Sequence, residues 1–438
     1  MTTAVGRRAG AAPAAHRAYG AGNLGVQLLA QTFATYATFF YVDHLGVEPG
    51  LIGAAMVVHG VLSAVLNPLF GHLSDRTRSR WGRRLPYIAF GMVPLAAAFV
   101  LVWTPPVSGP TALFWYFLAV VLVFDVLFVM VALNYSALFP ELFTSVAARA
   151  TAASWRQMYG IVGMIAGVAA APLLYGGVGW AAMGALLALL ALGSVAESLR
   201  GVPAADPAAA APATVPLLPA IRYTLANRAF VTYVAGSFLL QLTVAILQAS
   251  LPFFTKYALH EPDSANTVVL GAVFVTAIPL VYVWARLTRR LGPGRTVLAV
   301  VAVYGAVFPL FLVAGSMVAT VATTALLGVG IAGILMLLEI LLAEVIDDDE
   351  RRTGARREGM YFGMNGFVVK WSASLQAVVL GVVLSAYGYV AGADTQPESV
   401  VTGVRLLLGV VCPLILVPAL ACFLLYPLRR APLTPSPG

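Results

Sequence analysis

Long apolar segments recur along the whole chain, separated by short polar loops. Each has 18 or more mostly apolar residues, enough for a helix to cross about 30 Å of hydrocarbon. The weakest boundary is the glycine-rich run 175–179, which alone separates the fifth and sixth segments. The pattern predicts an all-α membrane protein with twelve transmembrane helices, near residues 22–42, 50–73, 85–104, 112–139, 153–175, 178–198, 229–256, 266–286, 295–315, 318–343, 360–388 and 403–427.

A stretch rich in proline and alanine interrupts the apolar pattern in the middle of the chain. Five prolines lie between residues 203 and 219, a composition typical of a flexible linker. We therefore expect an N-terminal six-helix bundle in 1–198, a cytoplasmic linker in 199–228 and a C-terminal six-helix bundle in 229–438. Arginine-rich loops at matching places in the two halves indicate a duplicated unit, and transporters built in this way hold their substrate between the halves.

Charged residues are few, and their placement predicts the orientation of the chain. Only 10% of the 438 residues are charged and 60% are hydrophobic, whereas soluble domains carry about 25% charged residues. Arginines gather before the first segment, after the second, eighth and tenth, and after the twelfth. The positive-inside rule makes this side cytoplasmic, with both termini inside a cytoplasmic (inner) membrane that the chain crosses many times. This distribution explains the net charge of +8 without a nucleic-acid partner.

The sequence lacks the residue clusters that would indicate an enzyme. Cys412 and Cys422 lie ten residues apart in one apolar segment, about 15 Å along a helix, and cannot bridge each other. No phosphate-binding glycine loop, metal-ligand cluster or nucleophile–base spacing is present. We therefore expect no enzymatic activity, no cofactor and no bound metal ion.

Four segments in chain order carry a resemblance to a known family. Residues 71–87, GHLSDRTRSRWGRRLPY, resemble the cytoplasmic loop of the major facilitator superfamily. Residues 19–46, 137–156 and 343–389 are similar to segments of the glycoside–pentoside–hexuronide:cation symporters, the family of melibiose permease. The resemblance implies the major facilitator fold, with two pseudo-symmetric six-helix bundles. It also implies a monomer in the lipid bilayer that binds a small-molecule substrate.

The chain also differs from the sodium-coupled members that it resembles. Those members carry two aspartates four residues apart in the second helix, where Ser63 and Asn67 stand here. Their aspartates in the first and fourth helices correspond to Gln27 and Ala132. Because a hard cation is bound best by anionic oxygens, the comparison favours a proton over sodium as a coupling ion.

Four residues are candidates for cation or proton coupling: His59, Ser63, Asn67 and Asp125. The first three are spaced i, i+4 and i+8 and share one helix face. Asp125 is a charged group within the fourth span, and it could pair with Arg156 across neighbouring helices. Histidine titrates near neutral pH and can relay protons. Proton coupling, facilitated transport without coupling, and a different ion site remain alternatives, as does a purely structural hydrogen bond from His59.

The candidates for substrate binding combine amide, aromatic and cationic groups inside the predicted helices. A hydroxylated solute needs hydrogen-bonding partners and an aromatic face, and charged groups in a membrane are functional candidates by default. The alternative role for the uncharged candidates is hydrogen bonding between helices. The substrate-binding candidates are Gln27, Tyr36, Asn134, Trp155, Arg156 and Lys370.

Acidic and basic residues at the predicted cytoplasmic helix ends suggest a gate. Ion pairs that form in one state and break in the other are a common two-state element, although the arginines could serve membrane topology alone. The gate candidates are Asp75, Arg76, Arg80, Arg83, Arg84 and Asp347.

These observations favour secondary active or facilitative transport of a small polar solute by alternating access. A sugar or glycoside is the expected substrate. The alternatives are a carrier of lysolipids or other amphiphiles and a membrane sensor that transports nothing.

Overall fold

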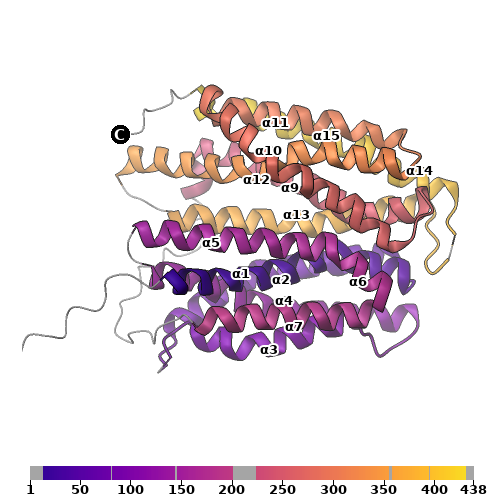
Figure 1. Cartoon of the computed structure of the whole chain (residues 1–438), viewed down its shortest axis with the longest axis horizontal. Helices are drawn as coiled ribbons and strands as arrows, with labels where there is room; N and C mark the ends of the chain where they lie inside the picture. The colour runs from indigo at the N-terminus through magenta and orange to yellow at the C-terminus, as the bar shows by residue number, and fades with distance from the viewer. Residues whose placement is uncertain are drawn as a thin grey trace, which may run out of the picture. The chain divides into compact units, whose positions relative to one another are not determined.

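A computed structural model describes residues 13–79, 81–143, 146–200, 223–354, 358–393 and 395–430 (Figure 1). Within these ranges all regular elements are helical. Those before residue 201 are α1 (Pro13–Phe39), η1 (Phe40–His44), α2 (Pro49–Arg76), α3 (Leu85–Val102), α4 (Pro110–Leu142), α5 (Val146–Ile165), η2 (Ala166–Ala170), α6 (Ala171–Val178) and α7 (Trp180–Arg200). Those after it are α9 (Arg228–Phe253), η3 (Phe254–Ala258), η4 (Asp263–Ala265), α10 (Asn266–Leu291), α11 (Pro293–Val307), η5 (Phe308–Leu312), α12 (Met317–Thr353), α13 (Glu358–Ala386), α14 (Glu398–Leu406), η6 (Leu407–Val411), α15 (Cys412–Leu424) and η7 (Pro427–Arg430).

Eleven helical segments of the described chain are long and apolar enough to cross a membrane. The first predicted span, α1, is not among them, although its 27 residues would reach about 40 Å. Polar side chains such as Thr32 and Thr35 lower its hydropathy, and both are fully buried. Because these polar residues of α1 point into the protein, α1 needs less apolar surface than the other helices. The prediction of an all-α, multi-pass membrane protein is confirmed.

The boundary between the fifth and sixth predicted spans lies at a single glycine. The helical run α5–η2–α6 ends at Val178, and α7 begins at Trp180. Gly179 has φ = 85°, a left-handed conformation that a glycine adopts without steric cost. The chain therefore turns within one residue, which explains why the hydropathy pattern showed almost no gap.

The helices form two compact units, Met1–Tyr41 with Val61–Ala213 and Val42–Gly60 with Thr214–Gly438. In the first unit α1 packs against α5 and α7, and α3 packs against α4 and α7. In the second unit α9 packs against α13 and α15, and α12 packs against α10 and α11. Figure 1 shows α10, α11, α12 and α15 running side by side. The predicted division into bundles at 198 and 229 remains a prediction, and the segment 42–60 packs with the second unit.

Candidate functional site

A polar cluster in the first unit surrounds Arg156, a half-buried arginine on α5. Its guanidinium donates a hydrogen bond to Ser136 Oγ of α4 at 3.0 Å. The guanidinium carbon also lies 5.8 Å from the ring centroid of Tyr135, within the range of a cation–π interaction. Both partners are neutral. The structure shows these contacts for the guanidinium, and not the pairing with Asp125 that the sequence suggested.

Close packing between α1 and α5 completes the cluster. A methyl group added at Gly20 would lie 2.9 Å from the backbone carbonyl carbon of Trp155, so the two backbones approach closely at this glycine. Asn23 Nδ2 donates to the carbonyl oxygen of Arg156 at 2.9 Å. One turn further along α1, Gln27 Cγ lies 3.6 Å from where a Cβ on Gly160 would stand. Small residues thus let an amide-bearing face of α1 reach the arginine helix.

Two tyrosines fix α1 against α4 next to this cluster. The Tyr19 hydroxyl donates to the Tyr135 carbonyl oxygen at 2.9 Å, and the Tyr135 hydroxyl donates to the Tyr19 carbonyl oxygen. Their rings stack with centroids 4.8 Å apart. Tyr19, Asn23 and Ser136 are not among the site residues predicted from the sequence. Only the close approach of three helices reveals their role in holding Arg156.

The structure brings three of the six predicted substrate-binding residues together. Gln27, Trp155 and Arg156 meet at the contact between α1 and α5. The other three lie elsewhere: Tyr36 further along α1, Asn134 near the arginine-rich loop, and Lys370 on α13 of the second unit.

Tyr36 is fully buried in an aromatic group of the first unit. Its hydroxyl donates to the Val168 carbonyl oxygen, and its ring makes edge contacts with Tyr175 and Trp180 at centroid distances of 5.4 and 6.5 Å. The ring and the hydroxyl are therefore both engaged by the protein. These contacts describe a packing role for Tyr36.

Asn134 belongs to a network around the loop between α2 and α3. Its Oδ1 accepts from Arg84 at 3.4 Å, and its Nδ2 donates to the Met130 carbonyl oxygen at 2.7 Å. Arg84 also donates to Ser74, and Arg83 forms a 2.8 Å ion pair with Glu141. The network joins α2, α3 and α4 within one unit.

The remaining gate candidates are placed only in part. Arg76 and Asp347 are exposed, at the end of α2 and on α12. Arg80 and the side chain of Asp75 lie outside the described residues. A gating role for these residues therefore stays a prediction.

The coupling candidates fall into both compact units. Ser63 and Asp125 are each 3% exposed in the first unit. Asn67 Nδ2 donates to the Ser63 carbonyl oxygen at 2.7 Å within α2. His59 is half-buried in the segment that packs with the second unit.

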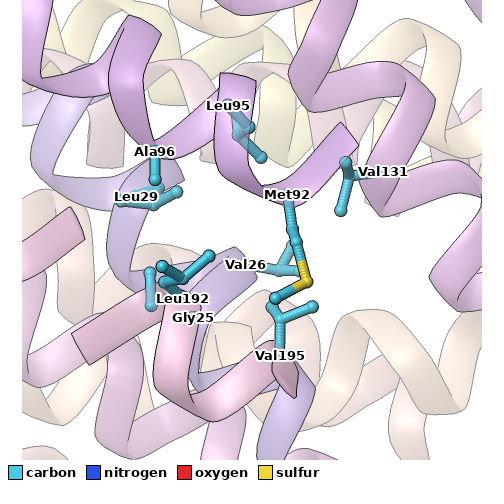
Figure 2. Close-up of a pocket in the computed structure, with 10 residues that line it drawn as sticks. Gly25, Val26, Leu29, Met92, Leu95, Ala96, Val131, Leu192 and Val195 are labelled. Atoms are coloured by element: carbon cyan, nitrogen blue, oxygen red, sulfur yellow. The ribbon is translucent and has the colours of Figure 1, made fainter. Parts of the chain in front are cut away.

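A small pocket in the first unit is lined by apolar side chains (Figure 2). Figure 2 shows Leu29, Met92, Leu95, Leu192 and Val195 around it. Its cavity volume of about 20 Å³ holds roughly one water molecule, whereas ligand pockets measure about 300–1,000 Å³. This pocket is therefore a packing gap.

A multi-pass helical protein with an arginine inside its spanning helices has the features of a solute transporter. A family model described as MFS/sugar transport protein matches residues 18–430. The chain belongs to this family of the major facilitator superfamily, and it is a transporter of the glycoside–pentoside–hexuronide symporter type. It moves a small-molecule solute.

Characterised and uncharacterised relatives align with nearly the whole chain. An uncharacterized symporter of Synechocystis is 27% identical, with 94% of each chain covered. The isoprimeverose transporter of Lactiplantibacillus pentosus is 26% identical over 82% of this chain and 77% of its own. The sodium-dependent lysophosphatidylcholine symporter 1-A of Danio rerio is 21% identical over 93% and 84%.

Solved structures share the fold. The nucleoside transporter NupG superposes with a TM-score of 0.68 at 16% identity, covering 94% of this chain and 99% of its own. A bacterial homolog of the lysosomal transporter Spinster superposes with a TM-score of 0.65 at 12% identity, covering 94% and 95%. These similarities confirm the major facilitator fold.

Proposed function

We propose that this chain carries a sugar or glycoside across the cytoplasmic membrane by alternating access, with Arg156 as its principal substrate-binding group. The observation that carries the proposal is the Arg156 cluster, in which the guanidinium contacts a neutral hydroxyl and an aromatic ring. A guanidinium presents five donors in a planar fork and binds vicinal hydroxyls or a carboxylate well. The family model and the isoprimeverose transporter support the sugar class.

The exposed polar residues beside Arg156 also support this proposal. Ser154 and Gln157 of α5 are exposed, while Trp155 and Arg156 are half-buried. Polar groups within a spanning segment are candidates for a functional role. A solute that reaches this face finds an amide, an indole ring and a guanidinium within a few residues.

Ligand-dependent thermal stability of the purified protein tests the substrate class. The panel contains mono- and disaccharides, glycosides and lysolipids, because a ligand that binds only the folded state raises its apparent stability. We expect a sugar or glycoside to stabilise the wild-type protein, and Arg156→Gln to remove that shift without lowering the melting temperature of the unliganded protein. Arg200→Gln is the matched control, since Arg200 lies on α7 with an 80% exposed side chain. The proposal would be overturned if no sugar or glycoside raised the thermal stability of the wild-type protein.

A lysolipid or another amphiphile is the second candidate substrate. It is favoured by the similarity over 93% of this chain to a lysophosphatidylcholine symporter. In this case, lysolipids and not sugars would raise the thermal stability of the protein. The loss of this stabilisation in Arg156→Gln would depend on the charge of the headgroup.

We further propose coupling to protons, with both termini on the cytoplasmic side. Asp125 is a buried carboxylate in a spanning helix, while Ser63 and Asn67 offer only neutral oxygens to a metal cation. Uptake driven by an imposed pH gradient, and lost in Asp125→Asn, is the expected result. Uptake that follows a sodium gradient and ignores pH would exclude proton coupling.

A further inference from the structure

Four arginines of the second unit gather where α10 ends and α11 begins. Gly292 alone separates the two helices, and its φ of 81° lets the chain turn within one residue. Its N–H donates to the Thr288 carbonyl oxygen at 2.9 Å, and its own carbonyl oxygen accepts from the Thr296 N–H at 3.1 Å. The same residue thus ends one helix and begins the next. The short turn keeps four exposed arginines close together: Arg286, Arg289, Arg290 and Arg295.

The charge of these arginines is not neutralised within the protein. Among the residues that the structure describes, none forms an ion pair or a hydrogen bond with any of the four guanidinium groups. The arginine-rich loop at the matching place in the first unit is different, because Arg83 forms a 2.8 Å ion pair with Glu141 there. The arginines of the second unit are therefore available to an anion from outside the chain.

The arginines continue an exposed apolar face of α10. Val275, Ile278 and Tyr282 are 73%, 52% and 79% exposed. Their spacing of three and four residues places them on one helix face, and Arg286 and Arg289 continue this spacing to the end of the helix. Because α10 is long and apolar enough to cross the membrane, its end reaches the level of the headgroups. One face of the helix therefore combines an apolar stretch with a cationic end.

A phospholipid with an anionic headgroup matches both parts of this face. Its acyl chains suit the apolar stretch from Val275 to Tyr282, and its phosphate accepts hydrogen bonds from guanidinium groups in a fork geometry. The Tyr282 ring lies one turn before Arg286 and is amphipathic, as are the aromatic side chains that gather at membrane interfaces. A free phosphate ion would match the arginines alone.

We propose that the end of α10 and the start of α11 bind an anionic phospholipid, whose phosphate is held by Arg286, Arg289, Arg290 and Arg295. Each basic side chain at a membrane surface strengthens the binding of an anionic lipid. The bound lipid bridges two helices at their shared turn and stabilises the folded protein. This site uses neither Arg156 nor a transported solute, so its test is independent of the proposed function.

Lipid titration of the delipidated protein tests the site. The protein in a non-ionic detergent is titrated with dioleoyl phosphatidylglycerol, which carries a net negative charge, or with dioleoyl phosphatidylcholine, which has the same acyl chains and no net charge. Native mass spectrometry counts the bound lipid molecules and gives the dissociation constant of the first one. We expect phosphatidylglycerol to bind at least about tenfold more tightly than phosphatidylcholine. Equal affinities would overturn the proposal.

A double variant on α10 locates the site. Arg286→Gln with Arg289→Gln should weaken the binding of phosphatidylglycerol about tenfold or more and leave that of phosphatidylcholine unchanged. The matched control is Arg351→Gln with Arg352→Gln, because these exposed arginines of α12 already pair with Asp348 at 3.6 and 2.8 Å. The control removes the same charge and should leave the affinity near that of wild type. An equal loss in both double variants would show a general effect of charge and rule out the site.

A lysine variant separates the role of charge from an effect on folding. Arg286→Lys with Arg289→Lys keeps both positive charges, so it should bind phosphatidylglycerol more tightly than the glutamine double variant. If the two double variants bound this lipid equally weakly, the arginines would act through the fold and not through the headgroup.

Inorganic phosphate distinguishes a lipid from a free anion. At the same concentration as phosphatidylglycerol, it should not raise the melting temperature of the wild-type protein, because it has no acyl chains to cover the apolar face of α10. Phosphatidylglycerol should raise this temperature, and the rise should be lost in the glutamine double variant. Equal stabilisation by inorganic phosphate would assign the arginines to a free anion and overturn the lipid site.

Discussion

The two compact units each contain a buried or half-buried charged group, but they satisfy it differently. Arg156 in the first unit contacts the Ser136 hydroxyl and the Tyr135 ring, neither of which offers a negative charge. Asp43 in the second unit has an ammonium and two tyrosine hydroxyls. Because desolvated charge is costly unless it is paired, the first arrangement agrees with the substrate-binding role that we propose for Arg156. In the second, the charge of the carboxylate is already paired within the protein.

Removing the ammonium group of Lys256 should have the largest effect on stability. Lys256→Met leaves the Asp43 carboxylate buried with hydroxyl donors in place of a cation, and we expect a loss of about 2–3 kcal/mol of stability. The value lies below that of a fully buried pair because Lys256 is partly exposed. The apparent melting temperature in detergent measures the loss. An unchanged melting temperature would show that Asp43 is not held by this pair.

Arg156→Gln should have the second-largest effect. It should lower the rate of transport rather than the stability of the protein. A hydrogen bond to a charged group contributes about 1.5–3 kcal/mol, so we expect at least a tenfold loss in initial uptake rate at low substrate concentration. The melting temperature without substrate should stay near that of wild type, because glutamine can still donate to the Ser136 hydroxyl. A large fall in stability with no change in uptake would give Arg156 the structural role instead.

Tyr389→Phe should have a smaller effect, because Lys256 and Tyr257 still hold the carboxylate of Asp43. The loss of one donor should cost about 1 kcal/mol and lower the melting temperature by less than Lys256→Met does. In the double variant with Asp43→Asn the two effects should not add. Additive effects would show that the Tyr389 hydroxyl stabilises the protein in some other way.

Arg200→Gln should have the smallest effect. Arg200 pairs with Glu197 at 2.9 Å, but the two side chains are 80% and 49% exposed. Such surface pairs contribute little, so uptake and melting temperature should both remain within error of wild type. A loss comparable to that of Arg156→Gln would mean that arginine charge in general, and not the cluster, supports transport.

The sequence predicted the fold well because the membrane limits the possibilities. Apolar segments of sufficient length can satisfy their backbone in lipid only as helices or closed barrels, and the motif at 71–87 indicated the superfamily. The same rules were weakest at α1, whose buried threonines make it less apolar than the other spans. They were also weak at Gly179, where one left-handed residue separates two helices.

The candidate site was predicted less completely, for a physical reason. Gln27, Trp155 and Arg156 could be identified from their residue types, and the structure places them together. Tyr36 and Asn134 have equally suitable side chains, but their polar groups bind the carbonyl oxygen of Val168 and the side chain of Arg84. Nothing local in the sequence distinguishes an available amide or hydroxyl from one that another helix already occupies.

The sequence by itself determined the membrane environment, the helical class and the family, because these depend on hydropathy and on motifs of neighbouring residues. Only the tertiary structure decided which polar groups meet. The contacts of Asp43 with Lys256 and Tyr389 span 213 and 346 residues, and the approach of α1 to α5 depends on Gly20 facing a backbone far along the chain. Contacts of this kind depend on how the helices pack in space, which the order of residues within each helix does not reveal.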